Sequence, residues 1–414
     1  MTAKINSKAG VLVLTFFTLL LGICGRAMAD PPGWKTIQLA TGGSFPQISG
    51  SNVIWYSTSG TFFWDGTTTT QITGANELSG SNVVWIGWDG NDSEIFFCDA
   101  SDPCNITQIT DNSYWDGFEP GYVNMIGISG SNVVWGGWPV SDDVSEIFFW
   151  NGSTTTQITN NSIRNEAVQI SDTNVVWQGY TSTYDCAVYF WDGSTTTKIP
   201  DSNGGGGSGG RPQISGSNVV WGGYGINPGS EIFFWNGSTT TQITNNSYND
   251  WYPQISGSNV VWQGGEGDDS EIFFWDGATT TQVTDNSYRD TSPQISGSNV
   301  AWVRGLGSGA DIFFWDAGNP GTITQITDSG SEDNFQQISG SSVVWEHLHD
   351  SRIRVAVKCS EPPSMELNGD CLVTFEDFAM LAEDWLDTND FDDLADMASQ
   401  WLECGYDIQG VCWQ

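Results

Sequence analysis

The sequence predicts an all-β propeller of eight four-stranded blades, followed by a small α-helical module. The propeller is indicated by a repeated core, Ile-Ser-Gly-Ser-Asn-Val-Val-Trp or a close variant, that recurs at intervals of 30 to 50 residues. The eight copies end at Trp55, Trp85, Trp135, Trp177, Trp221, Trp262, Trp302 and Trp345. Repeats of this length that are rich in β-branched and aromatic residues are typical of propeller blades. Seven blades is the alternative if the short first unit is not a separate blade.

Each copy is expected to hold four short strands, and residues 253–286 show them most clearly. The strand-forming runs of this copy are Gln254–Ser256, Asn259–Gln263, Glu271–Trp275 and Thr279–Thr284. The first-to-second and third-to-fourth connections contain glycine turns and barely vary between copies. The second-to-third connection and the connection from the fourth strand to the next blade vary in length. In a four-stranded antiparallel blade these two connections emerge on the same side. We therefore expect one uniform face and one variable face, with function on the variable loops.

The two ends of the repeat region predict a closed ring. The eighth unit lacks a Thr-Thr-Gln-Ile-Thr strand, and Lys35–Ala40 near the N-terminus match that missing strand. Pairing of these segments would remove an open sheet edge. We assign residues 30–359 to the propeller.

The repeat also carries a family resemblance. Its segments Ser-Glu-Ile-Phe-Phe-Trp-Asp-Gly, Thr-Gln-Ile-Thr and Asp-x-x-Pro-Gln-Ile-Ser resemble the repeats of TolB-like β-propellers. The resemblance covers roughly residues 34–358 and implies the fold. It says little about activity, because one fold hosts many functions.

Residues 1–29 predict export. They combine Lys4 and Lys8, an apolar run from Val11 to Ile23 and a small-residue cleavage site, as a secretory signal peptide does. No later stretch has the apolar length of a transmembrane segment. The whole chain has a formal net charge of −37, which excludes nucleic acid as a partner and favours cations or cationic partners. We expect a secreted or cell-surface protein.

Aromatic residues in the variable loops are the candidate ligand-binding residues. The tryptophans of the Val-Val-Trp and Phe-Phe-Trp motifs recur once per unit, as packing residues do. Those outside the motifs are free to contact a protein or a glycan, since aromatic rings carry much of the contact energy at interfaces. The candidates are Trp88, Trp115, Trp138, Trp251, Tyr114, Tyr248 and Tyr288.

No catalytic constellation is evident in the sequence. The acidic runs at 89–92, 142–143 and 268–269 lack the alternating ligands of a calcium loop, so we interpret them as solvated turn residues. His347 and His349 alone do not define a metal site. The sequence contains no P-loop, dinucleotide motif or nucleophile motif. Because the chain is expected to be exported, disulfides are favoured, and Cys98 and Cys104 flank a turn that one could close.

The C-terminal residues 360–414 differ in composition from the propeller. Residues 361–414 contain fourteen acidic residues and no basic one, and two segments, Phe375–Leu386 and Phe391–Leu402, each have one apolar helical face. Before the first segment, oxygen ligands stand at positions 1, 3, 5, 9 and 12 of an EF-hand-like loop, with a backbone carbonyl at 7. These are Glu366, Asn368, Asp370, Thr374 and Asp377, with the carbonyl of Leu372. The spacing predicts calcium as a cofactor, and an acidic helical hairpin without metal is the alternative.

This segment resembles a type I dockerin, a module with two loop-helix halves that binds a cohesin domain. Here Glu366 and Cys371 replace the usual Asp and Gly, and the second loop is shortened to Asp387–Asp390. The resemblance implies a cohesin-like partner. We therefore expect a non-enzymatic binding or scaffold protein, and the alternatives are a polysaccharide-degrading enzyme or a surface-layer component.

Overall fold

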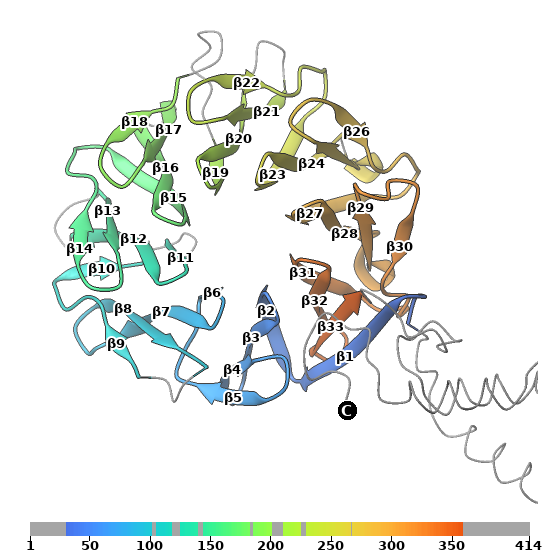
Figure 1. Cartoon of the computed structure of the whole chain (residues 1–414), viewed down its shortest axis with the longest axis horizontal. Coiled ribbons are helices and arrows are strands. Elements are labelled where there is room, and N and C mark those ends of the chain that lie inside the picture. The colour runs from blue at the N-terminus through green and yellow to red at the C-terminus, as the bar shows by residue number, and fades with distance from the viewer. Residues whose placement is uncertain are drawn as a thin grey trace, which may run out of the picture.

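The computed structural model describes residues 30–101, 105–117, 125–139, 144–182, 185–200, 210–224, 229–265 and 267–358. These residues form 33 strands in eight antiparallel sheets, which follow one another around a ring (Figure 1). The prediction of eight blades is confirmed, and the short first unit is a blade of its own. The predicted helical module lies outside the described residues, and the eight sheets supply no support for it.

The first four blades occupy residues 43–198. Their strands are β2 (Gly43–Ser49), β3 (Asn52–Ser57), β4 (Gly60–Trp64), β5 (Thr69–Ile72), β6 (Glu77–Ser79), β7 (Asn82–Trp88), β8 (Ser93–Asp99), β9 (Thr107–Gln108), β10 (Tyr114–Asp116), β11 (Ile126–Ser129), β12 (Asn132–Pro139), β13 (Glu146–Trp150), β14 (Thr155–Gln157), β15 (Arg164–Ser171), β16 (Asn174–Ser182), β17 (Asp185–Trp191) and β18 (Thr196–Lys198). The third blade departs from the four-stranded pattern, because its inner strand is split into β10 and β11, which both pair with β12.

The other four blades include the closing one. Their elements are β19 (Gly210–Ser215), β20 (Asn218–Tyr224), β21 (Ser230–Trp235), β22 (Thr240–Gln242), β23 (Asp250–Ser256), β24 (Asn259–Gly264), the short 3₁₀ turn η1 (Gly267–Asp269), β25 (Glu271–Trp275), β26 (Thr280–Gln282), β27 (Asp290–Ser296), β28 (Asn299–Arg304), the 3₁₀ turn η2 (Gly307–Gly309), β29 (Asp311–Asp316), β30 (Ile323–Gln325), β31 (Asp333–Ser339), β32 (Ser342–His347), β33 (Arg352–Lys358) and β1 (Trp34–Thr41). Strand β1 pairs antiparallel with β33, so the N-terminal segment completes the eighth blade as predicted.

The hydrophobic core lies between neighbouring blades. All eight repeat tryptophans are buried, with at most 7% of the surface of each exposed, which confirms their reading as packing residues. Trp262, for example, stacks on Phe273 of the next strand, with ring centroids 5.7 Å apart, and its cluster includes Val220 and Phe234 of the preceding blade. Each blade thus buries its apolar face only against its neighbours, so the ring depends on closure.

The uniform face explains why the Ser-Gly-Ser-Asn turn recurs. The serine before each turn glycine accepts a hydrogen bond from the backbone N–H at the glycine position of the next blade, at 2.8 Å around the whole ring. The link from Gly50 to Ser339 joins the first and eighth blades. The glycine position has a positive φ in every blade, and Asp172 takes it in the fourth blade with φ 54°.

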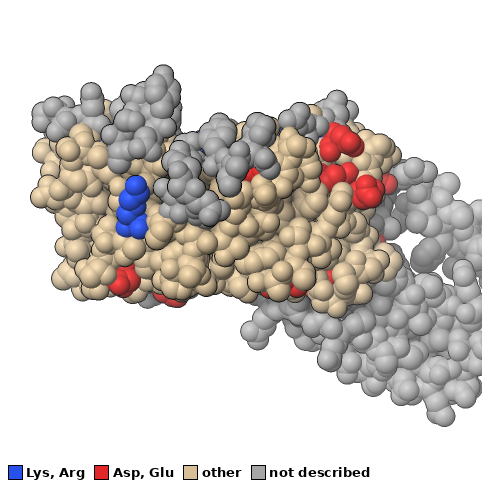
Figure 2. Space-filling model, turned by 90° about the horizontal axis from the view of Figure 1, so that it is seen from above, with Lys and Arg blue, Asp and Glu red and all other residues tan. Residues whose placement is uncertain are grey.

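The described surface is poor in basic groups. In the edge-on view of Figure 2, Lys and Arg are sparse, and acidic side chains gather toward the edges of the disc. No helix among the described residues has the length and hydropathy to cross a bilayer. Cys98 is disulfide-bonded, and the buried Cys186 accepts a hydrogen bond from Gln178.

Candidate functional site

In five blades a buried side chain on the inner strand, which is the first strand of the blade, accepts a hydrogen bond from the repeat tryptophan. The side-chain Oδ1 accepts the indole N–H at 2.8–3.1 Å, and each acceptor residue is 0% exposed. The pairs are Asp116 with Trp135, Asn165 with Trp177, Asp250 with Trp262, Asp290 with Trp302 and Asp333 with Trp345. Because a buried polar group needs a partner, these bonds fix the inner strand to the second strand.

A second carboxylate, from the third strand of the preceding blade, lies beside this acceptor. Between the fifth and sixth blades, Glu231 accepts from the Thr244 hydroxyl at 2.7 Å and from the Asn246 N–H at 3.1 Å. The Asn246 amide donates to Asp250 Oδ2 at 2.8 Å. Burial, with a smaller contribution from the Glu231 charge, raises the pKa of Asp250 to about 6. At this junction two buried acids therefore link the fifth and sixth blades.

The junction between the first and second blades lacks this acceptor. The connection from β5 to β6 is short, and its residues 73–76 bring no acid to the tryptophan of the second blade. Among the described residues, Trp85 Nε1 has no hydrogen-bond acceptor, and this residue is 7% exposed, compared with 1% for Trp262. The indole N–H of Trp85 therefore lacks the acceptor that five other junctions supply.

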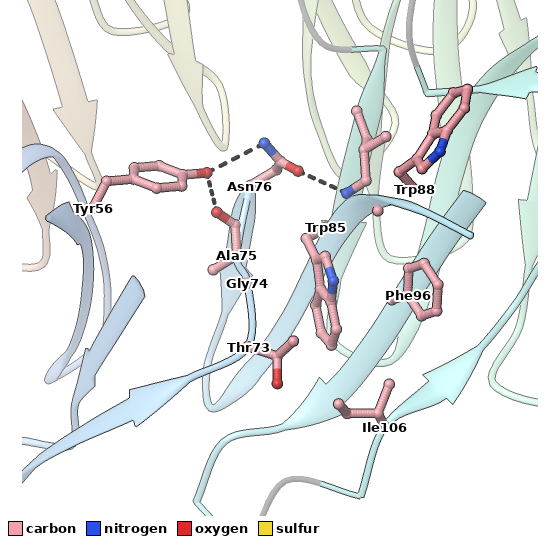
Figure 3. Close-up of a pocket in the computed structure, with 11 residues that line it drawn as sticks. Tyr56, Thr73, Gly74, Ala75, Asn76, Trp85, Trp88, Phe96 and Ile106 are labelled. Carbon is pink, nitrogen blue, oxygen red and sulfur yellow. Dashed lines mark hydrogen bonds between the residues drawn. The ribbon is translucent and has the colours of Figure 1, made fainter. Parts of the chain in front are cut away.

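A pocket of about 430 Å³ opens at this junction (Figure 3). Tyr56 and Asn76 lie on one side of it, and Trp85 and Phe96 lie on the other. The Tyr56 hydroxyl bonds the carbonyl of Ala75, Asn76 Nδ2 donates to the Tyr56 oxygen at 3.2 Å, and burial raises the pKa of Tyr56 to about 12. The polar groups of Tyr56 and Asn76 already have hydrogen-bond partners, whereas the Trp85 N–H has none within the described part of the chain. The pocket therefore suits a flat apolar ligand that carries a hydrogen-bond acceptor.

Of the seven predicted aromatic residues, Trp88 lines this pocket, whereas Tyr114, Trp115 and Trp138 belong to the third blade. Trp88 is 60% exposed and meets Trp115 edge to face, with centroids 5.9 Å apart. Tyr114 is half-buried and packs against Phe148. Trp138 is only 8% exposed and belongs to the core between the third and fourth blades. Ligand contact by this group remains a prediction, and Trp88 is its most accessible member.

The other three predicted aromatic residues lie on distant strands. Trp251 is 41% exposed at the start of β23. Tyr248 is half-buried and lines a second hollow of about 480 Å³ together with Asp269 and Glu271. Tyr288 is 61% exposed, and the Arg304 guanidinium lies 6.0 Å from its ring centroid. The structure therefore does not bring the seven predicted residues together at one site.

A row of left-handed bulges on the inner strands was not predicted from the sequence. In six blades the inner strand contains a register shift, and one non-glycine residue there has φ between 44° and 55°. These residues are Phe45, Ala167, Arg211, Tyr252, Ser292 and Phe335. Bulky residues rarely adopt this conformation, and such strain concentrates at functional sites. A bulky residue directly before Pro-Gln-Ile-Ser was the only signal available.

Three of these bulge residues are exposed aromatic residues. Phe45, Tyr252 and Phe335 are 56%, 62% and 43% exposed. Phe45 and Phe335, from the first and eighth blades, meet edge to face with centroids 5.0 Å apart. Their strands β2, β23 and β31 border the centre of the ring (Figure 1). We call these three residues the inner aromatic rim.

His347 is held inside the eighth blade. Its Nδ1 lies 2.8 Å from Asp333 Oδ1, and its Nε2 lies 3.9 Å from a carboxylate oxygen of Asp350. The residue is 6% exposed. Among the described residues, no serine or cysteine is bonded to this imidazole, so the arrangement there is a histidine between two acids and lacks a nucleophile.

The predicted calcium loop, Glu366 to Asp377, lies outside the described residues, and so do the signal segment and Cys104. Calcium binding there, a cohesin-like partner and export remain predictions.

Comparison with known proteins finds likeness only among solved structures. No family model matches the chain, and no curated protein matches it. The propeller domain of the Trilobed protease from Pyrococcus furiosus is 11% identical, with a TM-score of 0.48, and the match covers 70% of this chain and 97% of that one. The Pyrococcus horikoshii acylaminoacyl peptidase is 11% identical, with a TM-score of 0.47, and covers 74% of this chain. TolB from Acinetobacter baumannii is 13% identical, with a TM-score of 0.34, covering 67% of this chain and 79% of that one.

These comparisons correct the expected function. The similar structures are mostly peptidases or their propeller domains, so the comparisons contradict the expectation of a non-enzymatic scaffold that docks through a dockerin-like tail. The chain spans 57% of the length of the acylaminoacyl peptidase, and only the propeller is covered. At such low identity the likeness concerns the fold. The chain is an eight-bladed β-propeller, and TolB is one of the solved structures to which it is similar.

Proposed function

We propose that this propeller is the substrate-holding part of a hydrolase that acts on peptides. The observation that carries the proposal is the inner aromatic rim. Phe45, Tyr252 and Phe335 expose large apolar rings from backbone positions that are strained for such residues. Strain of this kind persists only where the surrounding structure enforces it, and it often accompanies ligand binding.

The strands that carry the rim favour a peptide. Each of β2, β23 and β31 is the last strand of its sheet, and all three face the centre of the ring (Figure 1). An edge strand offers backbone N–H and C=O groups to an extended peptide, and pockets or rings beside it select side chains. The net charge of −37 favours segments with basic as well as apolar side chains.

A peptide-binding assay on the full chain tests this proposal. Calorimetry should detect binding of peptides with aromatic and basic side chains. Tyr252→Ser and Phe335→Ser should each raise the Kd by up to about tenfold, because an aromatic contact contributes about 0.5–1.5 kcal/mol. Serine is tolerated at this bulge, since Ser292 occupies it in the seventh blade with φ 55°.

The matched control is Leu306→Ser, which removes an exposed apolar side chain from the turn between β28 and β29. It should leave the Kd unchanged. The absence of binding for every peptide would contradict the proposal. An unchanged Kd in both rim variants would show that peptides bind elsewhere on the propeller.

A further inference from the structure

Three carboxylates from three segments of the second and third blades meet at one point. Asp89 lies in the turn after β7, Glu94 on β8 and Asp111 in the connection that leads to β10. One carboxylate oxygen from each lies within 4.8 Å of the others. Asp89 and Asp111 are exposed, whereas Glu94 is 0% exposed. The cluster is therefore buried on the side of Glu94, which we call its buried floor, and open to solvent on the side of Asp89 and Asp111.

The buried floor of this cluster contains carboxylate oxygens without partners. Glu94 Oε1 accepts from the Asn112 N–H at 3.1 Å, but Glu94 Oε2 has no hydrogen-bond partner. Thr110 lies close to this carboxylate but does not complete a bond to Oε2. Asp92, two residues before Glu94 and 6% exposed, also has a buried oxygen without a partner. Such oxygens are costly unless a cation or donor reaches them.

Other blades supply a contrast within the same chain. Glu231 occupies the position of Glu94, and Gly229 and Asn245 replace Asp92 and Asp111. There both carboxylate oxygens are bonded, one of them to the Thr244 hydroxyl.

The sixth blade repeats the acidic pattern. Asp269, Glu271 and Asp285 stand in the same register as Asp92, Glu94 and Asp111, and Glu271 Oε2 again lacks a partner. Unpaired oxygens therefore occur where acids replace neutral residues around the central glutamate.

No basic side chain compensates the charge of this cluster. None of the ion pairs between described residues includes Asp89, Asp92, Glu94 or Asp111. Several like charges so close together repel one another, and a bound cation removes this repulsion.

We propose that Asp89, Glu94 and Asp111 bind a divalent cation, with calcium as the best fit and Asp92 at the buried side. Calcium takes oxygen ligands at about 2.3–2.6 Å, so two ligands on opposite sides of one ion lie about 5 Å apart, close to the spread of this cluster. The donor set contains no nitrogen or sulfur, which disfavours zinc. Water completes the coordination on the open side.

The cation ties the turn after β7 to the connection before β10. Trp88 directly precedes Asp89, and its ring meets Trp115, which lies four residues after Asp111. The bound ion therefore fixes the exposed aromatic pair and one border of the 430 Å³ pocket. Ligand binding at this edge of the ring should therefore require calcium.

Terbium luminescence and calcium calorimetry test the site. The full chain carries Asp370→Ala and Asp377→Ala, so that the predicted C-terminal loop does not contribute. We expect terbium emission excited through Trp88, displaced by calcium. Asp89→Asn with Asp111→Asn should weaken binding at least about tenfold, because even loss of an outer-sphere partner costs about 10–100-fold.

The control pair is Asp192→Asn with Asp276→Asn, which removes the same charge from two turns of the uniform face. Asparagine is tolerated there, since Asn151 and Asn236 cap the same turns with the same bonds. This pair should bind the ion as the parent does. No ion binding in the parent, or equal binding by both pairs of variants, would overturn the proposal.

Discussion

Two junctions between blades bind the indole N–H of the repeat tryptophan, one through an aspartate and the other through an uncharged asparagine. Between the fifth and sixth blades, Asp250 accepts the indole N–H of Trp262 at 3.0 Å. Between the third and fourth blades, Asn165 accepts that of Trp177 at 3.1 Å and donates to the carbonyl of Ser145 at 2.7 Å. Both acceptors are fully buried beside a glutamate. The comparison indicates that the acceptor oxygen fixes these two junctions, whereas the negative charge of Asp250 is an additional cost.

The largest expected effect comes from removing the acceptor. Asp250→Ala leaves the indole N–H of Trp262 and the amide of Asn246 without a buried partner. Each such group costs about 1–3 kcal/mol, so the free energy of unfolding should fall by about 3–5 kcal/mol. Urea denaturation measures this loss. A decrease below about 1 kcal/mol, on the scale of a single net hydrogen bond, would show that water replaces the carboxylate.

Asp250→Asn should stabilise the protein in a pH-dependent way. Burial raises the pKa of Asp250 to about 6 in the folded state, so the folded protein holds this proton more tightly than the unfolded chain does. Wild-type stability should therefore decrease as pH rises from about 4 to about 6, by up to about 3 kcal/mol, and change little from this group above that range.

The asparagine variant lacks this titration, and its bonding has a precedent, because Asn161 Oδ1 accepts from the Asn165 amide. The difference in unfolding free energy between variant and wild type should be near zero at pH 4 and largest at pH 7. A difference that is constant with pH would show that the charge of Asp250 is compensated.

Asn165→Asp is the reverse experiment and has the smallest expected effect. It places a carboxylate beside Glu146, which already accepts from the Asn161 N–H at 3.0 Å. The new carboxylate also faces the Ser145 carbonyl oxygen. The free energy of unfolding should therefore fall by about 1–2 kcal/mol at pH 7, within the range for a lost buried hydrogen bond. Part of this loss should be recovered at pH 5. Thermal unfolding at the two pH values measures this. Equal melting of variant and wild type at pH 7 would contradict the cost assigned to charge.

Much of the fold followed from the repeat, and less of the site did. The eight copies of the core gave the blade number, and Lys35–Ala40 predicted the closing strand, because strand composition and turn glycines are local signals. The acceptor at each junction was missed, although an acid or amide stands twelve residues before the repeat tryptophan in four blades. Its partner becomes visible only when the bulged inner strand folds beside the second strand.

The candidate site depended on features that do not repeat. The pocket beside Trp85 lies at a junction where the connection, residues 73–76, supplies no acid to the tryptophan, and a missing residue leaves no motif to recognise. The acidic run beginning at Asp89 was interpreted as a solvated turn, because the sequence does not show that Glu94 is buried or that Asp111 arrives from another connection. The segments that carry Asp89, Glu94 and Asp111 come together only when the ring has folded.

The closing blade also determines when this protein can finish folding. Strand β1 pairs with β33, and the Phe45 N–H donates to Glu346 across 301 positions of the chain. Contacts this distant in sequence are slow to form, because the entropy of closing the loop is lost before the contact stabilises anything. Until β33 arrives, a chain with seven assembled blades keeps two open flanks and the unpaired strand β1. Ring closure is therefore expected to limit the folding rate, and dilution or a chaperone should matter most during this last step.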